Sequence, residues 1–241
     1  MGRHVNELGQ VIGFPLPGWR PPPRPSRETL AGRLCRLEPL DPARHGDDLY
    51  RANALDADPR HWTYLPYGPF ADREAYRRWM EATCLGDDPL FFAIVDLATG
   101  APAGVASYLR IDPGNGSIEV GHLRFSSLLQ RKPGATEAMY LMMRRAFELG
   151  YRRYEWKCDA LNAPSRAAAL RLGLSYEGTF RQAMVIKGRS RDSAWFAATD
   201  RDWPALDSAF RRWLDPANFD EAGRQRVRLS ELTAPLRAAR D

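Results

Sequence analysis

The chain has 241 residues, 44% of them hydrophobic, which is enough for one domain of ordinary size with extensions. Its formal net charge of +5 is carried almost entirely by arginine, because Lys132, Lys157 and Lys187 are the only lysines. Residues 1–36 have a local excess of +4 from six arginines and two glutamates, but no basic stripe interleaved with aromatic residues follows, so nucleic-acid binding is not indicated.

The N-terminal segment is proline-rich. Residues 1–27 include FPLPGWRPPPRPSR, and proline at this density disfavours helix and sheet and favours extended polyproline II. We therefore treat residues 1–27 as an arm that precedes the domain. Because Phe14, Leu16 and Trp19 are apolar enough to be buried, we expect residues 11–23 to dock on the domain.

Residues 28–215 are predicted to form the domain, with strands and helices in mixed order. Asp41 is a candidate cap for a helix that runs to about residue 57. Strands are predicted at 32–38, 89–100, 102–112, 116–125 and 152–158, with two more within 175–199. Helices are predicted at 41–57, 72–84, 134–150, 165–173 and 202–214. This order predicts an α+β fold with a mixed, mostly antiparallel sheet flanked by helices.

The ends of the chain and its cysteines suggest a simple cellular context. Residues 216–241 are treated as a C-terminal tail, which we expect to fray from about residue 218. Cys35, Cys84 and Cys158 lack metal-ligand spacing, and we expect free, mostly buried thiols in a cytoplasmic protein. We expect no metal and no membrane association, because no apolar run resembles a signal peptide or a transmembrane span.

The most informative motif is QRKPGAT, from Gln130 to Thr136, which runs directly into an apolar-periodic helix. A short loop before a helix can present backbone N–H groups and a partial positive charge to a phosphate. Arg131 adds a planar fork that suits phosphate oxygens. Gly-Ala-Thr before a helix is also an ordinary helix start, so the loop alone leaves both interpretations open.

The elements around this loop resemble a known family. A strand precedes the loop and a helix follows it, and after them come the strand YRRYEWKCDALN and a helix beginning NAPSR. This order resembles the acetyl-CoA core of the GCN5-related N-acetyltransferases (GNAT). The similarity spans about residues 32–200 and is greatest to the branch with the ribosomal-protein alanine acetyltransferases RimJ and RimL. It implies a twisted sheet that splays at a cleft for acetyl-CoA, the co-substrate.

In that family the loop reads Q/R-x-x-G-x-G/A and binds the CoA pyrophosphate. The residues that fit this pattern are Gln130, Arg131, Gly134 and Ala135, while Thr136 takes the final small position. Pro133 removes one N–H donor, so the remaining backbone donors would be those of Lys132, Gly134, Ala135 and Thr136.

Glu119 is the candidate general base. Its neighbours Ile118 and Val120 should face the core, which places Glu119 on the other face of its strand. The resemblance implies that it takes the proton of the acceptor amine, often through water. An ordinary solvent-facing glutamate is the alternative, and His122 and His61 are other candidates, each more often structural.

The resemblance also assigns residues to the thioester. A bulge near Leu123–Phe125 would free a backbone N–H for the thioester oxygen, against the alternative of a regular strand end. Asn162 would contact the pantetheine arm, and Ser165 would lie near the sulfur as a candidate acid, although the two also fit an ordinary N-cap pair. Many members have a tyrosine where this chain has Ala169, so Ser165 or water would protonate the thiolate.

An aromatic loop, HWTYLPYGPF, should line the acceptor side. Its Trp62, Tyr64, Tyr67 and Phe70 would form a hydrophobic or cation-binding pocket, or else a small core beneath the loop. The sequence therefore predicts an N-acetyltransferase that transfers acetyl directly to a primary amine, of a protein N-terminus or a small molecule, in a ternary complex. The alternatives are transfer from a different acyl-CoA and a non-catalytic CoA-binding module. The acceptor and a homodimer are left open.

Overall fold

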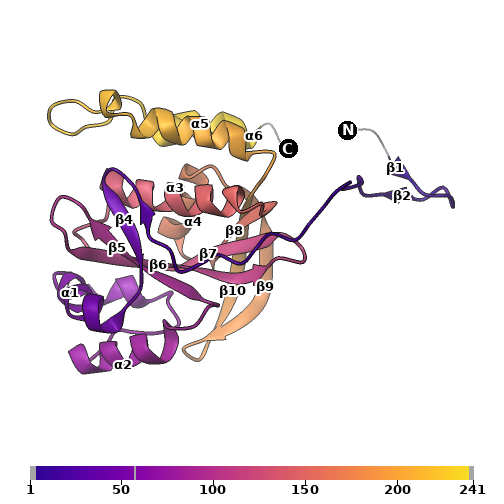
Figure 1. The fold of residues 1–241 in the computed structure, drawn as a ribbon. Helices are drawn as coiled ribbons and strands as arrows, with labels where there is room; N and C mark the ends of the chain where they lie inside the picture. The colour runs from indigo at the N-terminus through magenta and orange to yellow at the C-terminus, as the bar shows by residue number, and fades with distance from the viewer. Residues whose placement is uncertain (1–3, 57, 239–241) are drawn as a thin grey trace.

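The computed structural model describes residues 4–56 and 58–238. At its centre is an eight-stranded sheet in the order β3-β4-β5-β6-β7-β8-β10-β9 (Figure 1). Among the described strands of this sheet, β7 and β8 are parallel and every other neighbouring pair is antiparallel, which confirms the predicted mixed sheet. The strands are β3 (Leu30–Ala31), β4 (Cys35–Pro39), β5 (Leu90–Asp96), β6 (Pro102–Asp112), β7 (Ser117–Phe125), β8 (Arg153–Asp159), β9 (Ser175–Ile186) and β10 (Arg189–Thr199).

Helices cover both faces of the sheet (Figure 1). One face carries α1 (Pro42–Ala54) and α2 (Arg73–Thr83), and the other carries α3 (Pro133–Glu148) and α4 (Ala163–Arg171). Outside α3 lie α5 (Trp203–Leu214) and α6 (Leu229–Ala238), and short 3-10 turns occur at η1 (Pro59–Trp62) and η2 (Pro216–Asn218). Each face has its own hydrophobic core, a larger one under α3–α6 and a smaller one under α1 and α2.

Local capping explains where the first two helices begin. Asp41 Oδ1 accepts the backbone N–H of Ala43 at 2.8 Å, and Asp72 Oδ1 accepts that of Ala75 at 2.7 Å. Each carboxylate thereby satisfies a donor that has no partner inside the helix. The cap predicted at Asp41 is confirmed, and the helix that follows it ends at Ala54, slightly earlier than predicted.

The sheet separates between β7 and β8. Within the described residues, these strands pair from Ser117 with Arg153 to Val120 with Trp156 and no further. In the neighbouring ladder, Val105 pairs with Arg124 and Ser107 with Gly121, so two residues, His122 and Leu123, lie opposite one. This is a β-bulge, and His122 has a φ of 52°. The bulge expected near 123–125 therefore lies slightly earlier, at His122–Leu123, and Arg124 and Phe125 pair regularly with β6.

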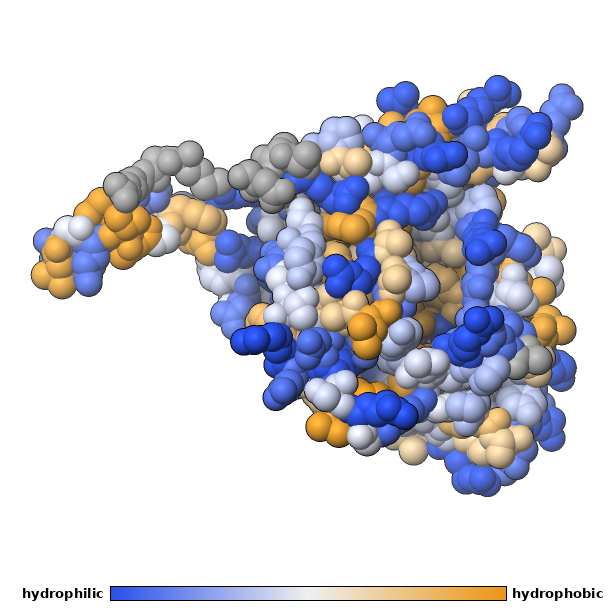
Figure 2. Space-filling model, turned by 180° about the vertical axis from the view of Figure 1, so that it is seen from behind, coloured by the Kyte–Doolittle hydropathy of each residue, from blue (hydrophilic) through white to orange (hydrophobic). Residues whose placement is uncertain are grey.

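The N-terminal arm has two parts. Residues 4–12 form a hairpin of β1 (His4–Val5) and β2 (Val11–Ile12), which the sequence did not predict and which projects from the body (Figures 1 and 2). Its apolar side chains, including Val5 and Val11, are exposed.

Beyond the hairpin the arm contacts the domain. A Cβ added to Gly116, which has a φ of 65°, would lie 2.4 Å from the ring of Trp19, so the indole packs directly on this turn. Arg24 Nη1 donates to the carbonyl of Ile111 at 3.1 Å, and Arg27 Nη2 donates to that of Leu85 at 2.5 Å. Phe14 is 39% exposed, but the centroid of its ring lies 4.1 Å from the guanidinium carbon of Arg201, so the arm already contacts the domain at Phe14.

The C-terminal segment forms a helix where we expected fraying. In α6 the side chains of Leu229 and Thr233 are fully buried, and Thr233 Oγ1 donates to the carbonyl of Arg171 at 3.0 Å. This corrects the expected tail over 229–238, because Leu229 and the other apolar residues of α6 face α4 and α5. The expectation for 239–241 lies outside the described residues. Among the helices described in 4–56 and 58–238, none has the length and apolar character of a membrane span.

Candidate active site

A cavity of about 1070 Å³ lies where β7 and β8 separate. Its lining includes the consecutive residues 119–123 of β7 and 156–159 of β8, together with loop residues before α2, the start of α4, and β9 and β10. Because consecutive strand residues point to opposite faces, the cavity is accessible from both faces of the sheet. Two substrates could therefore approach from opposite faces and meet between the separated strands.

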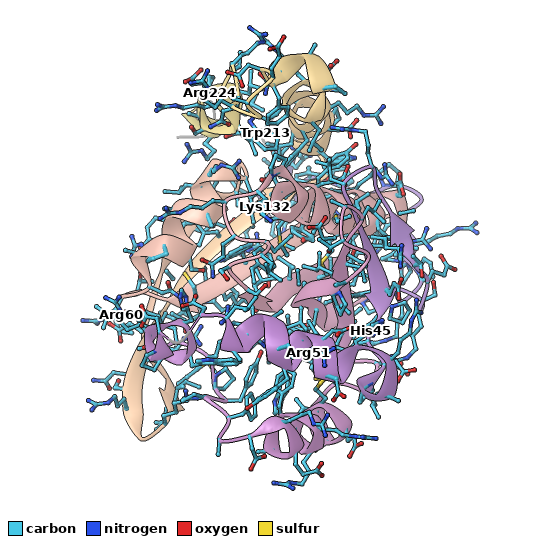
Figure 3. The ribbon with its side chains drawn as sticks, turned by 90° about the vertical axis from the view of Figure 1, so that its left-hand side faces the viewer. His45, Arg51, Arg60, Lys132, Trp213 and Arg224 are labelled. Carbon is cyan, nitrogen blue, oxygen red and sulfur yellow. The ribbon has the colours of Figure 1, made fainter. Side chains whose placement is uncertain are left out.

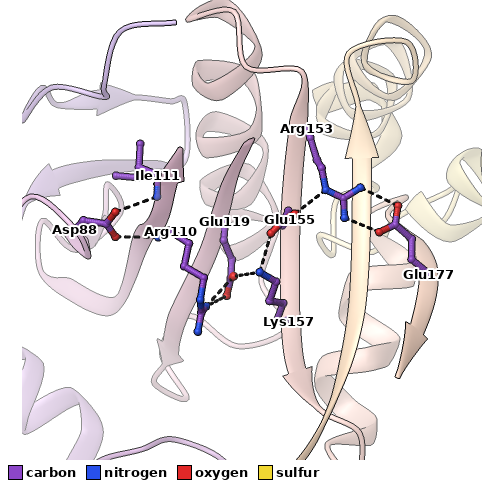
Figure 4. Close-up of polar contacts among 8 residues, drawn as sticks. All are labelled: Asp88, Arg110, Ile111, Glu119, Arg153, Glu155, Lys157 and Glu177. Carbon is purple, nitrogen blue, oxygen red and sulfur yellow. Dashed lines mark hydrogen bonds and ion pairs between the residues drawn. The ribbon is translucent and has the colours of Figure 1, made fainter. Parts of the chain in front are cut away.

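Glu119 lies in this cavity within a network of charges (Figure 4). Its side chain is 4% exposed, and Arg110 Nη1 lies 2.8 Å from each carboxylate oxygen. Lys157 Nζ lies 3.0 Å from Glu119 Oε2 and 2.8 Å from Glu155 Oε2. The sheet register explains this arrangement, because Glu119 pairs with Glu155 and Lys157 follows two residues later on the same face.

The environment of Glu119 favours its protonated form more than water does. Burial raises the pKa of this carboxyl, and the positive charges of Lys157 and Arg110 act in the opposite direction. The alternative of an ordinary solvent-facing glutamate is wrong, because the side chain is buried. A raised pKa brings this carboxyl closer to the neutral range in which a general base operates.

The two histidines considered as alternatives have different environments. Burial, aided by the nearby charge of Arg110, lowers the pKa of His122 to about 4, so this imidazole is neutral at pH 7. His122 lines the cavity, and its ring stacks on Tyr67 with the centroids 5.7 Å apart. His61 also lines the cavity, and its Nε2 lies 2.5 Å from Oδ2 of Asp56.

Of the residues expected near the thioester, Leu123, Asn162 and Ser165 line the same cavity, whereas Phe125 does not and packs against the larger core. Asn162 is the N-cap of α4, since its Oδ1 accepts the N–H of Ser165 at 3.2 Å. Ser165 Oγ accepts the indole N–H of Trp156 at 3.0 Å, which leaves the hydroxyl proton for another acceptor. Burial raises the pKa of the neighbouring Cys158, while a hydrogen bond with Ser165 acts to lower it. Ala169 is fully buried in the core.

The expected phosphate loop lies at the start of α3, where Lys132 is the N-cap residue (Figure 3). Two of its four expected donors are already used, because the N–H of Lys132 donates to Leu129 and the N–H of Ala135 donates to Lys132. The N–H of Gly134 has no backbone partner in the described part of the chain. A second cavity of about 430 Å³ lies beside Lys132 and Gly134, so a bound group has room here.

Side chains around this loop are oriented in different ways. Arg131 is exposed and has a φ of 60°, a conformation that is uncommon for a residue with a Cβ. Gln130 Nε2 donates to the carbonyl of Phe125 at 2.7 Å and so joins the loop to the end of β7. Thr136 is buried, and its Oγ1 accepts from Arg171 Nη1 at 3.0 Å. The loop is thus held from within, with Arg131 directed to solvent.

The aromatic loop divides between the core and the cavity. Trp62, Tyr67 and Phe70 pack in the smaller core and do not line the cavity, so the alternative of a core beneath the loop describes them. Tyr64 does line it, and its hydroxyl donates to the carbonyl of Leu161 at 3.1 Å. This bond joins the loop before α2 to the loop before α4.

Arg110 and Lys157 are site residues that the sequence did not reveal. The spacing of Glu155 and Lys157 places both on one face of a strand, but only the parallel pairing of β7 with β8 brings them to Glu119. Arg110 has a φ of 46°, and Asp88 accepts its backbone N–H at 2.8 Å. A sequence pattern does not reveal this local conformation.

The comparisons with known proteins agree with this architecture. The profile described as "Acetyltransferase (GNAT) domain" matches residues 35–175. The chain belongs to the GNAT acetyltransferase family. A GCN5-related N-acetyltransferase from Brucella melitensis is 47% identical, with a TM-score of 0.89 over 91% of this chain and 100% of that one. This GNAT protein is therefore an enzyme of acetyl-CoA-dependent acetyl transfer.

More distant structures share the fold. A protein described as a probable GNAT-family acetyltransferase from Chromobacterium violaceum ATCC 12472 is 42% identical, with a TM-score of 0.76 over 80% of this chain and 98% of that one. The ribosomal L7/L12 alpha-N-protein acetyltransferase RimL is 21% identical, with a TM-score of 0.58 over 71% of this chain and 94% of that one, and shows the fold alone. Among curated proteins no relative matches.

Proposed function

We propose that this acetyltransferase acts on a primary amine by direct transfer within a ternary complex, with Glu119 as the general base. The observation that carries the proposal is the buried carboxylate in a cavity that opens to both faces of the separated strands. When bound, acetyl-CoA supplies a thioester, and transfer forms an amide bond, breaks the C–S bond and releases CoASH. Direct transfer forms no covalent enzyme intermediate, so it requires no nucleophilic side chain.

Glu119 would remove the proton that makes the amine unreactive. An amine with a pKa of about 10.4 is almost wholly protonated at neutral pH and cannot attack a carbonyl. Lys157 and Arg110 hold the carboxylate in place at 3.0 Å and 2.8 Å. Their positive charges also favour its ionised form, while burial increases its proton affinity.

The chain's own residues suit a CoA group. The N–H of Gly134 and the positive end of α3 would bind the pyrophosphate, with Arg131 reaching over it from solvent. Gln130, Lys132, Ala135 and Thr136 would maintain the loop rather than each donate a backbone N–H.

The bulge at His122–Leu123 would place a backbone N–H from the segment Leu123–Phe125 near the thioester oxygen, where negative charge develops. Asn162 would contact the pantetheine arm. Ser165 could donate its hydroxyl proton to the departing thiolate in place of its hydrogen bond with Cys158, and water is the other source.

We further propose that the acceptor binds between Tyr64 and the β9–β10 hairpin. Both line the cavity on the side of Glu119. We also propose that the protein belongs to the RimJ/RimL branch and that its acceptor is a protein N-terminus. The support is that Glu119, Asn162 and Ser165, which the resemblance implies as site residues, line one cavity.

The test is release of CoASH from acetyl-CoA with a panel of amines, together with mass spectrometry of the products. Acetylated amine in proportion to CoASH supports the proposal. CoASH release only with a longer acyl-CoA would indicate a different acyltransferase, and CoA binding without any turnover would indicate a binding module.

A further inference from the structure

A row of unpartnered polar atoms lies on β10, beyond Lys157. Arg191 Nε, Ser193 Oγ and Trp195 Nε1 are each buried and have no hydrogen-bond partner within the described residues. All three residues line the main cavity. Buried polar atoms are normally satisfied, and leaving one unpaired costs stability. Three such atoms on one wall of one cavity therefore indicate a ligand.

The row lies on the same face of the sheet as Glu119. On β10 the alternate residues Ala194 and Phe196 belong to the larger core under α3–α6, so Trp195 and Ser193 face the other way. Ile118 and Val120 of β7 are in that core too, which places Glu119 on the face of the row. The row is thus on the side assigned to the acceptor.

Lys157 connects the row to Glu119. It is the register partner of Trp195, and its Nζ lies 3.6 Å from the centroid of that ring. The same Nζ lies 3.0 Å from Glu119. An acceptor whose amine reaches Glu119 would therefore extend past Lys157 along β10.

The chemistry of the row selects for an anion. A tryptophan N–H and a guanidinium only donate hydrogen bonds, and a serine hydroxyl can donate as well. The other cations of the cavity lining are paired: Arg60 with Asp58, His61 with Asp56, and Arg110 and Lys157 with Glu119. Within the described residues, Arg191 is the arginine of this lining without an ion-pair partner.

We propose that Arg191, Ser193 and Trp195 bind a carboxylate on the acceptor, so the substrate is an amine that also carries a carboxylate. This inference rests on the proposed amine acetylation and names its substrate class. The planar fork of Arg191 matches the two oxygens of a carboxylate, and Ser193 and Trp195 add neutral donors beside it. Phe180 and Met184 of β9 line the same cavity and would cover the apolar chain between the amine and the carboxylate.

The experiment compares ω-amino acids of increasing chain length with alkylamines of the same length, as acceptors of the full-length enzyme. At the best length, kcat/KM should be about 10- to 100-fold higher for the amino acid than for the alkylamine, the range expected of a charge-assisted contact. In Arg191→Met this ratio should fall to about one, while Arg191→Lys should retain part of it. Arg189→Met is the matched control, because Arg189 is exposed on the same strand and does not line the cavity.

A short peptide with an acidic side chain, compared with its amide counterpart, tells whether the carboxylate comes from a small molecule or a peptide. Binding is measured separately by NMR titration of the amino acid into the enzyme with CoA. If no amine is acetylated, the proposed function fails, and loss of binding in Arg191→Met would still support the carboxylate site. Equal kcat/KM for the amino acid and the alkylamine at every chain length would overturn the carboxylate site, and so would unchanged binding of the amino acid in Arg191→Met. A change confined to acetyl-CoA affinity would assign Arg191 to the co-substrate and also overturn it.

Discussion

The substitution Glu119→Gln tests the base directly. Glutamine has nearly the same size and still accepts a hydrogen bond from Arg110, but it cannot take a proton. Lys157 loses one carboxylate and keeps the other, because Glu155 lies 2.8 Å away. The fold should therefore survive, with a loss of roughly 1–3 kcal/mol in the free energy of unfolding.

The expected kinetic loss is much larger than this structural change. A positioned general base contributes about 10²–10⁴ in rate, or roughly 2.7–5.4 kcal/mol of activation free energy. Since burial raises the pKa of Glu119, the base form is lost as pH falls through that pKa, and wild-type kcat/KM should fall with it. His122, with a pKa of about 4, is neutral at pH 7, so its titration does not explain a change in kcat/KM around neutral pH. As pH rises towards the pKa of the amine, the defect of Glu119→Gln should shrink because free amine becomes available.

The assay is CoASH release across pH, with acetyl-CoA affinity measured by calorimetry. Glu155→Gln is the matched control, because Glu155 is the register partner of Glu119 and binds the same Lys157, but does not line the cavity. Both variants should lose similar stability, and only Glu119→Gln should lose turnover. Equal defects in both would mean that the charge network matters and not the base. Near-normal turnover of Glu119→Gln at neutral pH would refute the assignment, and a loss that persists at high pH would give Glu119 an orienting role.

Three further predictions concern other regions. Arg131→Ala should weaken acetyl-CoA binding by about 1.5–3 kcal/mol in calorimetry without changing the melting temperature, because the side chain is exposed; unchanged affinity would remove Arg131 from the site. Glu137→Gln should destabilise the fold by about 1–3 kcal/mol in urea unfolding, since this carboxylate accepts the N–H groups of three consecutive residues from Arg33 at 2.9, 2.6 and 2.9 Å; a loss under about 0.5 kcal/mol would contradict this. Chymotrypsin should cut slowly after Trp19 in the native protein, because the indole packs on Gly116, and rapid cutting there would show that the arm is loose.

Much of the fold could be predicted because local patterns determine it. Asp41 followed by Pro42 begins a helix by capping, and the alternation around Glu119 predicts a strand with one buried face. Where the local pattern is weak, prediction failed. The arginine-rich stretch from residue 218 was expected to fray, but its end forms α6 because Leu229 and Thr233 are buried against neighbours distant in sequence. Propensity alone does not contain that tertiary contribution.

The candidate site, too, could be predicted only in part from the sequence. Glu119, Asn162 and Ser165 could be named from the resemblance, and the structure brings all three to one cavity. What makes Glu119 chemically distinctive is set by residues from other strands, Arg110 and Lys157, whose side chains reach it only through the sheet register. Because a pKa depends on burial and charge together, the sequence can propose a base but not its proton affinity.

The aromatic loop and β10 show why residue type alone misplaces an acceptor site. Large aromatic side chains suggest a pocket, yet Trp62 and Phe70 pack against each other in the smaller core and do not line the cavity. A strand pattern does not mark the polar residues Arg191 and Ser193 as functional, because alternating polar residues are ordinary on the exposed face of a sheet. Their significance comes from Arg191 Nε and Ser193 Oγ, which are buried on the face of Glu119 and have no hydrogen-bond partner among the described residues. Acceptor specificity should therefore follow the unsatisfied donors of β10 rather than the aromatic loop.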